Sequence, residues 1–175
     1  MKVNLPARIM ESNIVIRPIE AKDNAALAKV IRQTLVEFGA NYPGTVYYDE
    51  TTDRLSTLFT VQGSGYFVAE LDSEILGGGG IFPTEGLDNG TCELVKMYLL
   101  PAARGKGLGA ALLQKCIAFA ISCGYKNMYL ETMPELSLAI RLYHKAGFKK
   151  LDSPLGKTGH FGCGIWMLLN LDQYK

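Results

Sequence analysis

The sequence lacks several features that would place it outside ordinary globular proteins. It has no apolar run as long as a membrane span, and Met1 to Pro18 show no signal-peptide pattern. Its formal net charge is only +1, so no general field attracts nucleic acid or an acidic membrane. We therefore expect a cytoplasmic protein that binds neither nucleic acid nor membrane.

Cysteine and histidine are also scarce. The chain has four cysteines and two histidines: Cys92, Cys116, Cys123, Cys163, His144 and His160. No Cys-x-x-Cys pair occurs, so the common zinc-site spacings are absent and we expect no metal. Cys116 and Cys123 lie seven residues apart, which predicts two small buried thiols on one helical face. We expect all four thiols to be free.

The chain has enough length and apolar content for a substantial core. Its 175 residues are 48% hydrophobic and 20% charged, which favours a single domain over residues 1–175. Residues 1–13 show no clear period. Beyond them, apolar spacing and turn residues predict the order βααβββαβαββ. The strands fall at 14–19, 66–71, 74–82, 92–99, 127–132, 148–151 and 164–171, and the helices at 23–39, 53–59, 108–125 and 134–145.

Some of these elements carry specific local expectations. Asp23 has the position and residue type of an N-cap for the first helix. Pro134 suits the first turn of the last helix, and Gly147 suits its C-terminal end. Four consecutive glycines at 77–80 supply no side chains to their strand. Such a run predicts a bulge or a close approach of two backbones.

The chain is organised around a strand, a basic glycine-rich loop and a helix. Arg104, Gly105, Lys106, Gly107 and Gly109 lie around the start of the helix that begins at Leu108. The first turn of a helix has N–H groups without intrahelical partners and carries partial positive charge. Glycines let an anion approach those amides, and the two cations add attraction. The stretch therefore predicts a site for a phosphate or pyrophosphate.

Three phosphate-binding patterns compete for this loop. A Walker-type loop requires Gly-Lys-Ser/Thr, which Ala110 and Ala111 exclude. A dinucleotide fingerprint fits the spacing of Gly105, Gly107 and Ala110, but Leu100 to Arg104 separate the loop from its strand. Too few residues then remain for a doubly wound sheet, which leaves a nicotinamide-dependent oxidoreductase as a distant alternative.

The third pattern fits better. Arg104-x-x-Gly107-x-Gly109 resembles the coenzyme A pyrophosphate loop of the GCN5-related N-acetyltransferases (GNAT superfamily). The resemblance continues through Glu131-Thr132 and through Ala139-Ile140-x-Leu142-Tyr143-x-x-x-Gly147-Phe148. It covers residues 93–169 well and 14–71 more weakly. It implies a mixed α/β fold, with a mostly antiparallel central sheet that contains a splayed parallel pair.

The resemblance also implies a function and a cofactor site. The protein would be an N-acetyltransferase that moves the acetyl group of acetyl-CoA directly to a primary amine. Pantetheine would bond to the backbone of the strand before the loop, and the pyrophosphate to the loop amides. The implied cofactor-binding residues are Met97, Tyr98, Leu99, Arg104, Gly105, Lys106, Gly107, Leu108, Gly109 and Ala110. The alternative is a non-catalytic acyl-CoA-binding or regulatory module of the same fold.

Two catalytic residues follow from the same resemblance. Tyr143 matches the family's tyrosine, the general acid that protonates the leaving thiolate. Leu136 stands where family members often have Asn, so one cofactor hydrogen bond is in doubt. Glu93, at the head of the strand before the loop, matches a glutamate that acts as base in some members. Glu131 and His160 remain alternative bases.

The sequence defines the binding side for the acceptor amine less clearly than the cofactor site. In the family, the segment after the first helix covers it, and here residues 41–53 are aromatic and acidic without Lys or Arg. Such a loop favours a cation. We therefore expect a small-molecule or peptide acceptor with more than one amine, while a homodimer is left open as the assembly.

Overall fold

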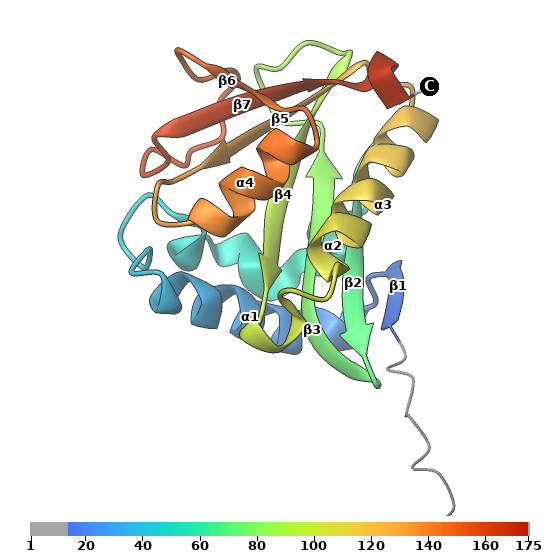
Figure 1. Ribbon diagram of the computed structural model, residues 1–175, viewed down its shortest axis with the longest axis vertical. Coiled ribbons are helices and arrows are strands. Elements are labelled where there is room, and N and C mark those ends of the chain that lie inside the picture. Colours follow the sequence, from blue (N-terminus) through green and yellow to red (C-terminus); the bar gives the residue numbers. More distant parts are fainter. Residues whose placement is uncertain (1–13, 175) are drawn as a thin grey trace, which may run out of the picture.

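The computed structural model describes residues 14–174, so residues 1–13, for which the sequence shows no clear period, lie outside the described part. Residues 14–174 form one seven-stranded sheet and four α-helices (Figure 1). The strands are β1 (Ile14–Pro18), β2 (Gly65–Leu71), β3 (Glu74–Phe82), β4 (Thr91–Leu99), β5 (Asn127–Thr132), β6 (Lys149–Leu151) and β7 (Ile165–Asn170). The helices are α1 (Asn24–Glu37), the single-turn α2 (Leu55–Leu58), α3 (Leu108–Ser122) and α4 (Ser137–Lys145).

Two neighbouring strands diverge in the middle of the sheet. Its strand order is β1-β2-β3-β4-β5-β7-β6, and within residues 14–174 only β4 and β5 pair in parallel. That pairing ends at Glu93 opposite Tyr129, although β4 continues to Leu99. Beyond this point β5 and β7 turn away from β2, β3 and β4 (Figure 1). The splayed parallel pair predicted from the sequence is thus confirmed.

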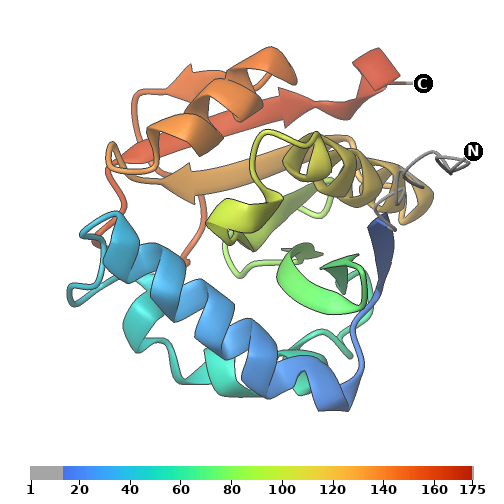
Figure 2. The same ribbon diagram turned by 60° about the horizontal axis from the view of Figure 1, so that its bottom comes forward.

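Helices cover both faces of the sheet (Figure 2). Because side chains alternate along β2, Phe67 joins the core under α3, whereas Tyr66 and Val68 join the core under α1 and α2. The first core includes Leu112 of α3, and the second includes Leu35 of α1. These two cores pack against opposite faces of the sheet on either side of its opening.

Close packing around β3 explains its run of glycines. A Cβ at Gly78 would lie 2.5 Å from the Tyr66 ring, and a Cβ at Gly77 would collide with the carbonyl of Tyr98. The β3–β4 register also shifts between Gly78 and Gly80. Both predictions for the run, a bulge and a close backbone approach, are confirmed.

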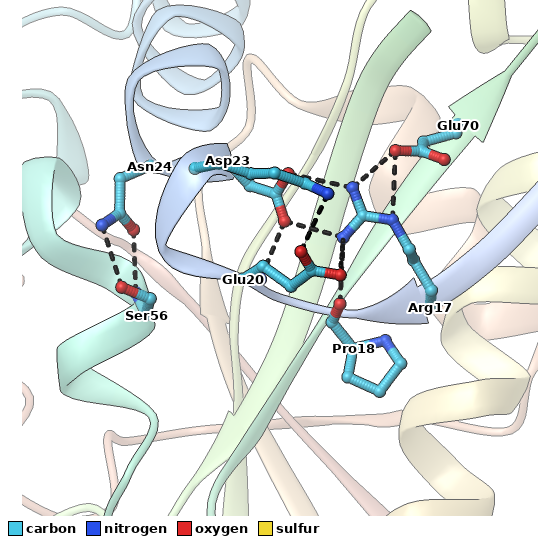
Figure 3. A network of polar contacts seen from close by, with 8 residues as sticks. Arg17, Pro18, Glu20, Asp23, Asn24, Ser56 and Glu70 are labelled. Carbon is cyan, nitrogen blue, oxygen red and sulfur yellow. Dashed lines mark hydrogen bonds and ion pairs between the residues drawn. The ribbon is translucent and has the colours of Figure 1, made fainter. Parts of the chain in front are cut away.

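The chain is tied at its N-terminal side by a network around Arg17 (Figure 3). The Arg17 guanidinium donates to both carboxylate oxygens of Asp23, at 2.7 and 2.9 Å, and to Glu70 of β2 at 2.5 Å. Asp23 also accepts from the Glu20 amide. Asp23 holds the predicted N-cap position of α1, but its side chain makes no cap hydrogen bond, because its carboxylate is engaged by Arg17 and by the preceding turn. These bonds lower the pKa of Asp23.

Two helix ends differ from the prediction. The Leu136 amide bonds to the Met133 carbonyl and closes a turn that contains Pro134, so α4 begins only at Ser137. Helix α3 ends at Ser122, and Gly124 follows with a φ of 88°. Cys123 therefore lies past the helix and is exposed, contrary to the predicted buried pair, whereas Cys116 is buried. All four cysteines are free, as expected.

Candidate active site

A cavity of about 310 Å³ lies where β4 leaves β5. It is lined by the end of β4, the glycine loop, α4 and part of α1. Of the predicted cofactor residues, those that line it are Met97, Tyr98, Leu99, Arg104, Gly105, Gly107, Gly109 and Ala110. Leu108 is buried in the core, and Lys106 is exposed on the loop. The structure thus brings most of the predicted set to one cavity.

The glycine loop has the backbone of an anion site. Gly107 occupies the N-cap position of α3 with a φ of 77°, and Gly105 has a φ of 73°. Both values lie in the left-handed region that favours glycine. A Cβ built on either residue would meet nothing within 4 Å, so the space above the loop is open. The amides of the first turn of α3 face no intrahelical partner there.

Arg104 holds the loop in place. Its Nε and Nη2 donate to the Leu99 carbonyl at 3.0 and 2.9 Å, and its Nη1 and Nη2 donate to Glu37 of α1 at 2.5 and 2.8 Å. The guanidinium also lies over the Phe38 ring, 4.9 Å from its centroid. Most of its donors are thus used inside the protein, which fastens the loop to α1 and to β4.

Tyr143 lies at the inner wall of the cavity. It is 6% exposed, and its ring centroid is 5.6 Å from that of Phe148. Burial, followed by the nearby Cys116, raises the pKa of its phenol, which therefore stays protonated at neutral pH.

Thr34 of α1 and Leu136 line the same cavity. Thr34 is 3% exposed. Among residues 14–174, its Oγ1 is the one buried side-chain oxygen or nitrogen without a hydrogen-bond partner.

A second pocket, of about 550 Å³, lies further back along β4. It is lined by Glu93, Val95 and Lys96 of β4, by the segment from Gly44 to Thr51, and by the loops that follow β3 and precede β7. Lys96 has a φ of 50°, a strained value for a residue other than glycine. It sits at the bulge opposite Gly78 to Gly80, and it directs its side chain to Asp49 at 2.5 Å.

Glu93 is the buried acid of this second pocket. It is 4% exposed, and it accepts a 2.5 Å hydrogen bond from the Thr84 hydroxyl. Burial raises its pKa to about 7, and the charge of Glu131 acts in the same direction. Thr84, His160 and Lys96 oppose the shift. A carboxyl group with this pKa can exchange a proton at neutral pH.

The three candidate bases that the sequence left as alternatives share one place. Side-chain oxygen and nitrogen atoms of Glu93, Glu131 and His160 all lie within 4.8 Å of one another. His160 comes from the β6–β7 loop, whose Lys157 amide bonds to the Glu85 carbonyl and whose Gly162 amide bonds to that of Gly44. Two carboxylates beside an imidazole would draw a cation to this cluster.

The acidic acceptor loop is largely neutralised. Asp53 makes a bidentate pair with Arg32 of α1 at 2.7 Å, and Asp49 contacts Lys96. Burial opposes ionisation of Asp49, but the His160 ring, 3.6 Å away, and the Lys96 charge outweigh it and lower the pKa of Asp49. Glu50 stays exposed.

Sequence reasoning missed Lys96, Thr84 and Thr34 as site residues. A lysine inside an apolar strand was a visible signal for the first of them. The two threonines gave none, because their placement depends on how distant segments pack.

The model of the Acetyltransferase (GNAT) family matches residues 30–148, and the chain belongs to this family. The predicted class, an acetyl-CoA-dependent N-acetyltransferase, is thereby confirmed at the level of the family. The dinucleotide alternative is overturned, because a sheet with one parallel pair is not doubly wound. No helix among residues 14–174 is long and apolar enough to cross a membrane.

Particular relatives agree with the family match. The chain is 42% identical over 158 residues to the "Uncharacterized N-acetyltransferase YjgM" of Escherichia coli (strain K12), covering 90% of this chain and 95% of that protein. A GNAT-family acetyltransferase from Staphylococcus aureus Mu50 superposes with a TM-score of 0.81 at 21% identity, covering 91% and 99% of the two chains. The putative acetyltransferase yncA of Salmonella typhimurium, solved with acetyl-CoA, superposes with a TM-score of 0.70 at 27% sequence identity. The superposition covers 92% of this chain and 95% of that chain.

Proposed function

We propose that the protein acetylates a primary amine, with acetyl-CoA in the cavity at the sheet opening and the amine in the second pocket. One observation carries this proposal. β4 supplies Met97, Tyr98 and Leu99 to the first cavity, and it supplies Glu93 and Lys96 to the second. A single strand thus lies between a predicted thioester site and a titratable acid.

The cofactor would be held mainly by backbone. The pyrophosphate would rest on amides from Gly105 to Ala110, with the charge of Lys106 beside it. Arg104 would keep the loop in the required shape through Glu37 and the Leu99 carbonyl. Rotation about its Cα–Cβ bond would turn the unpartnered Thr34 hydroxyl towards the cavity, where a pantetheine amide could bond to it. Leu136 offers no such bond.

The chemistry would divide between two residues. Glu93, as base, takes a proton from the amine, which then attacks the thioester carbon. A backbone N–H of β4 would donate to the oxyanion. As the carbon–sulfur bond breaks, Tyr143 donates its proton to the thiolate.

For the acceptor, we propose a small-molecule or peptide amine. The pairing of Asp49 with Lys96 and of Asp53 with Arg32 removes two of the carboxylates expected to hold a second positive group. Support for an acceptor with several amines is therefore reduced to Glu50 and the tyrosines of the loop.

An amine screen tests the proposal. Purified protein, acetyl-CoA and a library of primary amines would be assayed for released CoA thiol, with the thermal stability of the protein measured in acetyl-CoA, CoA, NAD and NADP. We expect turnover with at least one amine. Acetyl-CoA should stabilise the fold by about 2.7 kcal/mol at a hundredfold excess over Kd. Stabilisation without turnover across the library would favour a binding module instead.

A further inference from the structure

Glu93 and Glu131 face each other where the sheet splits. The last paired residues of the parallel ladder are Glu93 and Tyr129, and Glu131 follows two positions along β5 on the same face as Tyr129. Their nearest side-chain oxygens lie within 4.8 Å. Two negative charges at this separation disfavour each other in a partly buried place.

The charged neighbours offset this repulsion only in part. Lys96 and His160 both act to lower the pKa of Glu93, but Lys96 is held by Asp49, and His160 also lies against Asp49. Glu131 accepts hydrogen bonds from Tyr129 at 2.8 Å and from Thr158 at 2.7 Å, which fix its carboxylate in place. Glu93 accepts a hydrogen bond from the Thr84 hydroxyl, and it lines the proposed acceptor pocket. Lys157 and Glu85 pair with each other on the rim of that pocket.

We propose that Glu93 and Glu131 act as a coupled pair that holds one proton while the acceptor pocket is empty and releases it when an amine binds as its ammonium ion. This inference rests on the proposed function, and it adds the charge state of the acceptor and a role for Glu131. Glu131 touches Glu93 rather than the reacting atoms, so it is a positioning residue. Together with burial, its charge accounts for the raised pKa of Glu93.

The protons balance over one cycle. Binding of R–NH₃⁺ expels the shared proton to solvent and leaves an ammonium–carboxylate pair at Glu93. In the reaction the carbon–nitrogen bond forms and the carbon–sulfur bond breaks. One ammonium proton passes to Glu93, and a second replaces the proton that Tyr143 donates to the sulfur. The products are R–NH–acetyl and CoA thiol, and Glu93 again holds the proton that the next ammonium ion displaces.

The pair also sets a substrate class. An ammonium ion gains the charge attraction of both carboxylates, whereas an amine with its own carboxylate beside the nitrogen meets like-charge repulsion. The other pocket walls include Leu58, Phe82 and Val95. The acceptor that fits is a primary ammonium ion on an apolar carbon group.

Carboxyl titration tests the pair without any turnover. The full chain, labelled with glutamate carrying ¹³C at the side-chain carboxyl, would be titrated by NMR, with the Glu93 signal assigned by its loss in Glu93→Gln. We expect a midpoint of about 7 in the parent. Glu131→Gln should lower it by roughly one pH unit, equivalent to a tenfold change in proton affinity. Glu135→Gln removes a carboxylate outside the cluster, and it should leave the midpoint in place.

The ammonium part is tested with n-butylamine as the probe and n-butanol as its neutral counterpart. n-Butylamine should lower the Glu93 midpoint and release protons into a weakly buffered solution, and n-butanol should do neither. A midpoint that is unchanged in a folded Glu131→Gln variant, or the same response to both probes, would overturn the proposal. Neither result depends on acetyl transfer, so the proposed function is judged separately by the amine screen.

Discussion

The two pockets along β4 are lined by different kinds of chemical groups. The proposed cofactor cavity is formed mainly by glycines, backbone and apolar side chains, and its loop is one continuous stretch, 104–110. The proposed acceptor pocket gathers titratable side chains from segments far apart in the chain: Asp49, Glu93, Lys96 and His160. The first arrangement suits a ligand that is constant across a family. In the second arrangement, replacing a few side chains would change which acceptor binds and its protonation state.

The largest expected effect is on the acceptor side. Glu93→Gln keeps the size of the side chain and removes the base, so kcat should fall roughly 10²- to 10⁴-fold while the Kd for acetyl-CoA stays unchanged. Because the base acts when deprotonated, kcat/KM of the parent, which reports the free enzyme, should rise with pH through about 7. The variant should lack this rise. Steady-state kinetics at several pH values and calorimetry with acetyl-CoA provide the check. A parental kcat in the variant would remove Glu93 from the mechanism.

On the cofactor side, Tyr143→Phe should have a smaller effect on the same rate. A thiol has a reference pKa of about 8.5, so its anion leaves with less help than an amine would need. We expect kcat to fall roughly a hundredfold, at the low end of general-acid effects. The rise of kcat/KM with pH near 7 should persist, since Glu93 is intact. Single-turnover rates of acetyl transfer that equal those of the parent would contradict this role.

Two matched glycine substitutions distinguish a loss of acetyl-CoA binding from a loss of stability caused by backbone strain. Gly107 and Gly124 both have left-handed φ values, 77° and 88°, with open space at the Cβ position, and they lie at opposite ends of α3. Gly107→Val and Gly124→Val should each lower the free energy of unfolding by about 1–2 kcal/mol. Only Gly107→Val should also weaken acetyl-CoA binding, by about tenfold or more. Equal Kd values in the two variants would place the pyrophosphate elsewhere.

The sequence predicted the fold well because its signals were local. Apolar spacing and turn residues located every strand to within two residues, and the glycine loop marked the start of α3. Errors arose at helix ends. The turn over Met133 to Leu136 replaced the first turn of α4, and exposed Cys123 followed the earlier end of α3. Local spacing does not decide such boundaries, since they depend on caps and on tertiary packing.

The acceptor side was predicted only in part, because its interactions join distant residues. Composition suggested that residues 41–53 would present free acidic groups, but Arg32 and Lys96 pair with two of them across 21 and 47 positions. Arg104 was predicted as a phosphate ligand, and it also meets Glu37 across 67 positions. Glu93, Glu131 and His160 were each identified by residue type and neighbouring pattern. Their convergence follows from the packing of β5 and the β6–β7 loop against β4.

The early end of the β4–β5 ladder has a consequence for the exchange of backbone hydrogens. Past Glu93, β4 runs on to Leu99 without β5 beside it, so one edge of the strand faces the cavity. Arg104 already occupies the Leu99 carbonyl there. Amide hydrogens on this edge should exchange quickly with deuterium in the free protein and slowly once pantetheine lies in the gap. The amides that slow down would map the path of the cofactor residue by residue, because the cofactor would bond to β4 where β5 no longer does.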